Sequence, residues 1–263
     1  MDEARLTDLR RWFSDYCRTF YTENEEDNRN IRLKEEHTAR VCGAMELLAD
    51  SLALSAADRR IAAAVALFHD VGRFEQYRRF RTFKDSASIN HAALGVRVLV
   101  EEGVLAGLPE EERRLIASSV GLHNVFRVPA GLGERHRQFL RLIRDADKLD
   151  IWRVFIEFYR QPEGERASAV GLGFPDIPEC TPEVVATLLR GEMVDLATLR
   201  TLNDFKLLQL SWVFDLNFPR SRELVRELGY VERLAETIPR SADVDRAIGV
   251  VRDALFRVDP VTF

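Results

Sequence analysis

Four of the five histidines interrupt the apolar faces of predicted helices. At about 100° per residue, His37 shares a helix face with Val41 and Leu48, and His69 ends an apolar stretch. An unpaired imidazole is costly in an apolar interior. One such histidine is most often a hydrogen-bonded packing residue, but four on four helices together favour a binding site. The four are His37, His69, His91 and His123.

Two aspartates accompany these histidines. Asp70 directly follows His69, and Asp147 falls in the same narrow helix sector as Leu140 and Ile143, whereas Asp145 points elsewhere. A carboxylate on an apolar face needs a cation, an arginine or a metal to neutralise it. Imidazole and carboxylate together suit Mn, Fe, Zn or Ni, while Mg alone prefers more oxygen ligands. The pattern therefore predicts a site for divalent metal ions.

The residues with this chemistry lie on predicted helices, and no alternating strand pattern appears. Helices are expected over 6–20, 32–52, 55–70, 88–103, 109–123, 134–160, from Thr181, and around 193–216, 220–237 and 241–256. Loops are expected at 21–30, 73–85 and 161–180. We predict an all-α protein forming a single domain, 1–263, with a metal-binding core over about 30–160 and a helical cover over about 181–263.

Composition excludes several classes of protein. A net charge of -5 provides no basic field for general nucleic-acid binding, and no apolar stretch is long enough to span a membrane. The first residues lack a secretory signal, which predicts a cytoplasmic protein. The three cysteines are unclustered, which predicts reduced thiols, and the oligomeric state is left open.

The order of the polar residues resembles the HD-domain superfamily of metal-dependent phosphohydrolases. The resemblance rests on HTARV at 37, FHDVGR at 68 and DADKLD at 145, and it covers roughly residues 30–155. It implies an HD-domain helical bundle with additional C-terminal helices. The further histidines in SINHAALG and GLHNVF resemble those of the two-metal members.

This resemblance implies roles for individual residues. One ion would take His37, His69, Asp70 and Asp147, and a second would take Asp70, His91 and His123, so that Asp70 bridges them. The cofactor would be one or two divalent ions (Mn, Fe, Ni, Mg or Zn) that activate a hydroxide. Arg73 and Lys148 are expected to act with Asp70 in catalysis, because charge must be stabilised on phosphoryl oxygens. The expected substrate-binding residues are Arg73, Lys84, Asn124 and Lys148, with Arg78, Arg79 and Arg81 as weaker candidates.

The resulting prediction is a hydrolase for a phosphomonoester or phosphodiester, such as a nucleotide or another small phosphorylated metabolite. Two features differ from related families. Val71, Gly72 and Arg73 stand where some nucleotidases carry a glutamate, and Asn124 follows His123 where cyclic dinucleotide phosphodiesterases have a second histidine. The alternatives are a diiron oxygenase resembling inositol oxygenase on the same scaffold, and a helical interaction module that retains the site as a relic. His136 is expected to be exposed.

Overall fold

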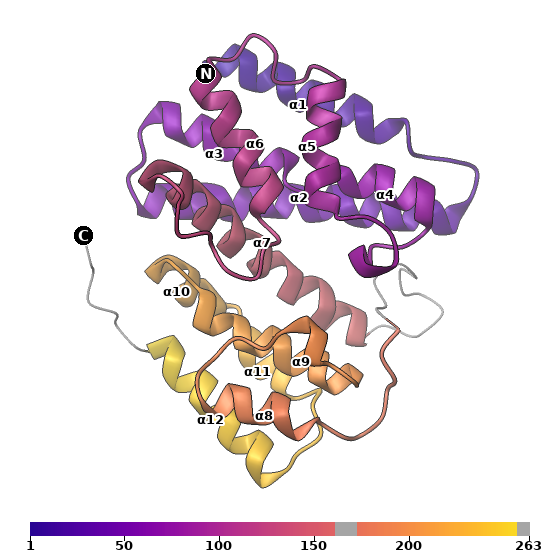
Figure 1. Cartoon of the computed structure of the whole chain (residues 1–263), viewed down its shortest axis with the longest axis vertical. Coiled ribbons are helices and arrows are strands. Elements are labelled where there is room, and N and C mark those ends of the chain that lie inside the picture. Colours follow the sequence, from indigo (N-terminus) through magenta and orange to yellow (C-terminus); the bar gives the residue numbers. More distant parts are fainter. Residues whose placement is uncertain (161–172, 257–263) are drawn as a thin grey trace. The chain divides into compact units, whose positions relative to one another are not determined.

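The computed structural model describes residues 1–160 and 173–256, and the chain is helical without strands in these parts. The predicted all-α fold is therefore confirmed (Figure 1). The chain divides into two compact units, the first comprising Met1–Asp150 and the second beginning at Ile151. The boundary lies inside one long helix. That the chain forms a single domain, with the second unit covering the first, stays a prediction.

The first unit is a bundle of helices that supplies all the predicted metal ligands. Helix α2 packs on α3, α3 also packs on α1 and α6, and α5 packs on α4 and α6. Large side chains such as Phe68, Phe74 and Leu115 are fully buried between them. The helices are α1 (Glu3–Arg18), α2 (Glu25–Ser51), α3 (Ala56–Phe68), α4 (Gly72–Phe80), the short 3₁₀ helix η1 (Asp85–Ala87), α5 (His91–Glu101), α6 (Glu110–Leu122) and α7 (Glu134–Arg160).

Helix α2 begins earlier than predicted. We expected residues 21–30 to form a loop, but the helix starts at Glu25. The Asn24 side chain accepts hydrogen bonds from the backbone N–H groups of Glu26 and Asp27, which satisfies two donors at the helix start. Acidic residues in the first turn also interact favourably with the helix dipole. The acidic stretch is thus a helix start, and it places Lys34 and His37 in the middle of α2.

Helix α4 replaces most of the loop expected over residues 73–85. Its charged residues pair with one another along the helix, because Glu75 lies one turn from both Arg78 and Arg79 and forms ion pairs with them. Phe74 and Tyr77 are buried. The helix ends where Arg81 adopts a left-handed conformation. Apolar periodicity does not predict this helix, because charged residues occupy many of its positions.

The second unit contains the end of α7 and the C-terminal helices. Helix α12 packs on α8, α9, α10 and α11. Trp152 of α7 is buried and donates a hydrogen bond to the carbonyl of Gln209, 3.0 Å away. Thr181 and Pro182 start α8 as predicted, whereas the part of the predicted loop at 161–172 lies outside the described residues. The helices are α8 (Pro182–Leu189), η4 (Leu196–Thr198), α9 (Leu202–Ser211), η5 (Trp212–Asp215), α10 (Pro219–Glu227), α11 (Tyr230–Ala235) and α12 (Ala242–Phe256).

The described residues also bear on the predictions for membrane-spanning segments and for the cysteines. None of their helices is both long enough and apolar enough to cross a lipid bilayer. The cysteines are free thiols, and Cys17 is buried while Cys42 and Cys180 are partly buried.

Candidate metal centre

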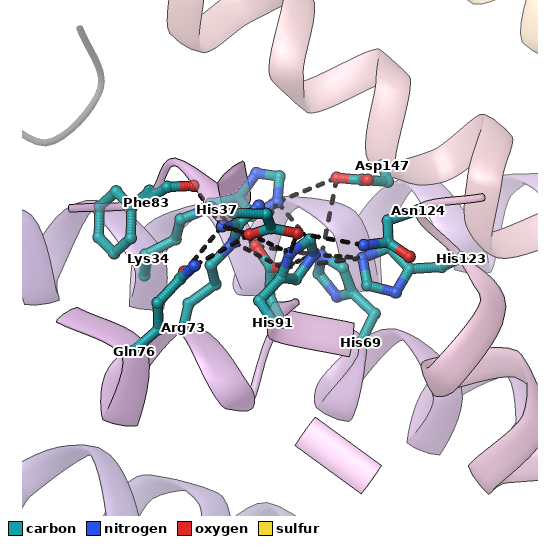
Figure 2. A network of polar contacts seen from close by, with 12 residues as sticks. Lys34, His37, His69, Arg73, Gln76, Phe83, His91, His123, Asn124 and Asp147 are labelled. Carbon is teal, nitrogen blue, oxygen red and sulfur yellow. Dashed lines mark hydrogen bonds and ion pairs between the residues drawn. The ribbon is translucent and has the colours of Figure 1, made fainter. Parts of the chain in front are cut away.

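The four predicted histidines come from four helices of the first unit and converge on one point (Figure 2). His37 lies within α2, His69 and His123 directly follow the last residues of α3 and α6, and His91 is the first residue of α5. All four are at least 96% buried. The polar residues that interrupted apolar faces in the sequence therefore meet inside the bundle.

Backbone carbonyls orient two of the imidazole rings. His69 Nδ1 lies 2.7 Å from the carbonyl oxygen of Ala66, and His123 Nδ1 lies 2.8 Å from that of Val120. A carbonyl oxygen can only accept a hydrogen bond, so Nδ1 carries the proton in both rings. The neutral form then leaves a lone pair on Nε2, which is the atom that faces the other histidines.

Carboxylates orient the other two rings. His37 Nδ1 lies 2.7 Å from Oδ2 of Asp150, and His91 Nδ1 lies 2.7 Å from Oδ2 of Asp85. Burial opposes protonation of His37, but its contacts with Asp147 and Asp150 raise its pKa. A carboxylate that accepts from Nδ1 fixes the tautomer and makes Nε2 a better metal ligand.

The Nε2 atoms meet in two pairs. His37 Nε2 lies 3.2 Å from His69 Nε2, and His91 Nε2 lies 3.0 Å from His123 Nε2. Burial, with the neighbouring His91 and His69, lowers the pKa of His123 to about 3, so this ring is neutral at pH 7. The pKa of His91 is lowered as well, mainly by burial, so in this pair two nitrogen lone pairs face each other and repel unless a cation lies between them. This arrangement fits a metal ion, because neutral imidazole nitrogen is a common metal ligand.

Asp70 lies between the two histidine pairs and turns one oxygen to each. Its Oδ2 is 3.5 Å from His37 Nε2 and 3.8 Å from His69 Nε2. Its Oδ1 is 3.3 Å from His91 Nε2 and 3.8 Å from His123 Nε2. Burial opposes its ionisation, but the ammonium of Lys34, the neighbouring imidazoles and the guanidinium of Arg73 hold the pKa of Asp70 well below its usual range. A carboxylate placed in this way can contact two ions at once.

Asp147 adds an oxygen to the first pair. Its Oδ1 lies 3.1 Å from His37 Nε2 and 3.7 Å from His69 Nε2, and this buried atom has no hydrogen-bond partner. Burial opposes its ionisation, but the two imidazoles hold the pKa of Asp147 well below its usual range. An ionised carboxylate oxygen without a hydrogen bond in a buried site fits a metal ligand. Two ligand groups thus share Asp70, namely His37, His69 and Asp70, and Asp70, His91 and His123.

Comparison with known protein families agrees with this geometry. A sequence model of the family described as HD domain matches residues 35–152. The chain contains an HD domain. The match begins just before His37 and ends just after Asp150, so it covers every histidine and aspartate of the centre. Comparisons with curated proteins and with solved structures found no significant match.

Two cations of the HD-domain bundle lie against Asp70. Lys34 Nζ is 2.7 Å from Oδ2 of Asp70, and Arg73 Nε is 3.4 Å from its Oδ1. Arg73 was expected at the site, whereas Lys34 was missed, although its position one helical turn before His37 on the same helix could have indicated it. Each half of the centre therefore has one positive side chain beside the shared carboxylate.

Arg73 is anchored by its Nη1 atom. This atom donates hydrogen bonds to the carbonyl oxygen of Phe83, to Oε1 of Gln76 and to Oδ1 of Asp85, at 2.5, 2.8 and 2.9 Å. Its Nε atom is buried without a hydrogen-bond partner. The guanidinium is thus fixed at one end beside Gln76 and Phe83, and its Nε atom lies near Asp70 at the other.

The other predicted substrate-binding residues occupy different places. The Asn124 amide donates to Oδ2 of Asp85 at 3.3 Å, so it lies beside the histidines. Lys84 precedes η1, and Lys148 is buried on α7 next to Asp147. Their roles toward substrate stay predictions.

The roles of the weaker candidates toward substrate stay predictions, whereas His136 differs from expectation. Arg78 and Arg79 form ion pairs with Glu75, and Arg81 forms one with Asp27 at 2.5 Å, so these arginines have partners of their own. His136 is partly buried, and the prediction that it is exposed is wrong. It lies in the first turn of α7, and its side chain is partly covered there although polar residues surround it in the sequence.

Proposed function

We propose that this HD domain hydrolyses a phosphomonoester or phosphodiester, on a nucleotide or another small phosphorylated metabolite, with the help of divalent metal ions. The observation that carries the proposal is the position of Asp70. Its two oxygens face separate histidine pairs, and a cation lies beside each oxygen. A centre built to hold positive ions, with further positive side chains at its edge, is suited to a substrate that carries negative charge on several oxygens.

Metal ions bound here (one or two of Mn, Fe, Ni, Mg or Zn) would lower the pKa of water and polarise the phosphoryl oxygens. The first group of ligands would be His37, His69, Asp70 and Asp147, and the second Asp70, His91 and His123. The chain's own contribution is to hold these groups in place before substrate arrives. Asp85 and Asp150 orient one histidine in each group, and two backbone carbonyls orient the others.

Lys34 and Arg73 are assigned to the phosphoryl group. A bound ion would compete with Lys34 for Oδ2 of Asp70, and the released ammonium could then pair with a phosphoryl oxygen. Arg73 would keep its three Nη1 hydrogen bonds and offer its remaining N–H groups. An arginine with a fixed planar fork is well suited to phosphate oxygens, and a lysine acts as a mobile point charge.

A screen of metals and substrates tests the proposal. Purified protein is loaded with Mn, Mg, Ni, Co or Zn and incubated with nucleotides, cyclic nucleotides and sugar phosphates, and the hydrolysed products are quantified. We expect turnover of at least one class with the metal present and loss of turnover in the Asp70→Ala variant. A matched control is Asp58→Ala, because Asp58 is a carboxylate of the same unit that pairs with Arg135 away from the histidines.

The same screen separates the diiron oxygenase alternative. Hydrolysis that proceeds at equal rate without oxygen supports the present proposal. A metal-loaded protein that hydrolyses none of these esters, or that turns over only with iron and oxygen, contradicts it.

A further inference from the structure

We propose that Asp85 is the positioning residue of the second ion, so that the two ions are held by separate carboxylate supports and can be removed one at a time. The inference rests on the proposed two-ion centre and adds to it a residue outside the predicted ligand set. It assigns Asp85 to the half formed by His91 and His123, and Asp150 to the half formed by His37 and His69.

The carboxylate of Asp85 accepts several hydrogen bonds next to the half formed by His91 and His123. Its two oxygens lie 2.9 and 2.7 Å from Nδ1 of His91. It also accepts from Nη1 of Arg73 and from Nε2 of Gln76, both at 2.9 Å, and from the amide of Asn124 at 3.3 Å. Such a set of donors fixes the carboxylate in one orientation. The carboxylate in turn fixes the His91 ring with its Nε2 atom toward His123 and Asp70.

Asp150 has the equivalent place in the first half, where it lies 2.7 Å from Nδ1 of His37. The two supports come from different parts of the bundle, since Asp85 begins η1 and Asp150 lies on α7. The hydrogen bonds described for Asp85 do not include His37, His69 or Asp147. Loss of the Asp85 side chain should therefore leave the first half intact.

The two halves also differ in the number of ligands available. The first has four candidate side chains, His37, His69, Asp70 and Asp147, and the second has three, Asp70, His91 and His123. In the second half, one of only two histidines depends on Asp85 for its orientation. Partners that orient a metal-binding histidine typically contribute about 10- to 100-fold to metal affinity. The second ion should be the more sensitive to loss of its support.

Manganese alone is the probe for the test. The full-length protein is stripped of metal and titrated with Mn²⁺, and bound metal is counted by elemental analysis and by EPR. Two Mn²⁺ ions that share one carboxylate are magnetically coupled, whereas a single ion has the spectrum of an isolated centre. The variants are Asp85→Ala, which removes the support, and Asp85→Asn, which keeps a hydrogen-bond acceptor without the charge. Asp58→Ala is a matched control, since the Asp58 and Asp85 side chains are both 30% exposed.

We expect two coupled ions in the wild type and in Asp58→Ala. Asp85→Ala should bind one uncoupled ion, and Asp85→Asn should bind the second ion about 10- to 100-fold more weakly than the wild type. Asp150→Asn should instead weaken the other, tighter step of the titration. Unfolding temperatures measured without metal show whether each variant is folded. If Asp85→Ala does not fold, the inference is tested with Asp85→Asn alone.

Two results overturn this inference while leaving the proposed function standing. In the first, Asp85→Ala and Asp85→Asn bind two coupled ions with wild-type affinity. In the second, both ions are lost together from folded Asp85→Asn, which would make Asp85 a support of the whole centre. A wild-type protein that binds no manganese and hydrolyses no ester overturns the proposed function as well.

Discussion

The ammonium group of Lys34 lies 2.7 Å from Oδ2 of Asp70, and this ion pair joins α2 to the His-Asp pair 36 residues further along the chain. The oxygen concerned is the one that faces His37 and His69, where the first ion would bind. Lys34 Nζ also lies 5.1 Å from the centre of the Phe83 ring, which is a favourable cation–π contact. Lys34 and a metal ion bound at the first half would therefore compete for one carboxylate oxygen.

Replacing Lys34 with methionine should change metal binding and substrate binding in opposite directions. Metal affinity should rise, because Oδ2 of Asp70 is no longer paired with an ammonium. The KM for a phosphate ester should rise about 10-fold or more, since a hydrogen bond to a charged group contributes roughly 1.5–3 kcal/mol. Metal titration and steady-state kinetics measure the two effects, and Lys34→Arg is the charge-preserving control. Equal loss of metal and substrate binding would show that Lys34 only supports the fold.

Replacing Arg73 with lysine should be nearly as damaging as replacing it with alanine. Arg73 contacts Phe83, Gln76 and Asp85 through one nitrogen and Asp70 through another, and a lysine has a single nitrogen. We expect kcat/KM for the phosphate ester to fall about 10-fold or more in both variants. Arg79→Lys is the matched control, because Arg79 pairs with Glu75 on α4. Full activity of Arg73→Lys would mean that only its charge matters.

The convergence of the histidines could be predicted from the sequence because of a simple energetic rule. A polar residue on an apolar helix face must find a partner, and the partners of His37, His69, His91 and His123 proved to be one another together with Asp70 and Asp147. The helical fold followed from the same periodicity. The position of each histidine on an apolar face depends on residues within one helix, which is the range over which sequence patterns are informative.

Other parts of the site depend on contacts that sequence patterns do not show. Asp85 reaches His91 and Arg73 only because α4 and α5 pack together and hold η1 beside them. Asp150 follows Asp147 by three residues and so lies on the same side of α7, which could have indicated it. The start of α2 was missed because its signal is the capping side chain of Asn24, which an apolar pattern does not include.

Replacing Gly72 with alanine should destabilise the first unit. A Cβ atom at Gly72 would lie 2.2 Å from the backbone oxygen of His91 and 2.5 Å from the backbone nitrogen of Gly95. Because both neighbours are backbone atoms, α4 and α5 would have to move apart, at a cost of about 1–3 kcal/mol or more in the free energy of unfolding. Urea unfolding measures this cost, and metal titration should show weaker binding at the His91 half.

The matched control for Gly72→Ala is Gly43→Ala. Gly43 lies within α2, and a Cβ atom there would meet nothing within 4 Å. Alanine is favoured over glycine in a helix by up to about 1 kcal/mol, so this variant should unfold at the same or a higher urea concentration. If both variants unfold at the same urea concentration, the close approach of α4 and α5 at Gly72 does not restrict this position to glycine.

Removing the metal should lower the unfolding temperature of the protein. In the buried centre the pKa values of Asp70 and Asp147 are held well below their usual range by Lys34 and the imidazoles, so both carboxylates can bind cations, and bound cations should stabilise the folded state selectively. A ligand at about 100 times its Kd, bound only by the folded state, adds roughly 2.7 kcal/mol to the free energy of unfolding. Thermal unfolding is followed with EDTA and again after excess Mn²⁺ is restored. Asp70→Asn should show little change between the two conditions, whereas Asp58→Ala should respond like the wild type. If the unfolding temperature of the wild type changes with neither EDTA nor manganese, these side chains do not bind an ion.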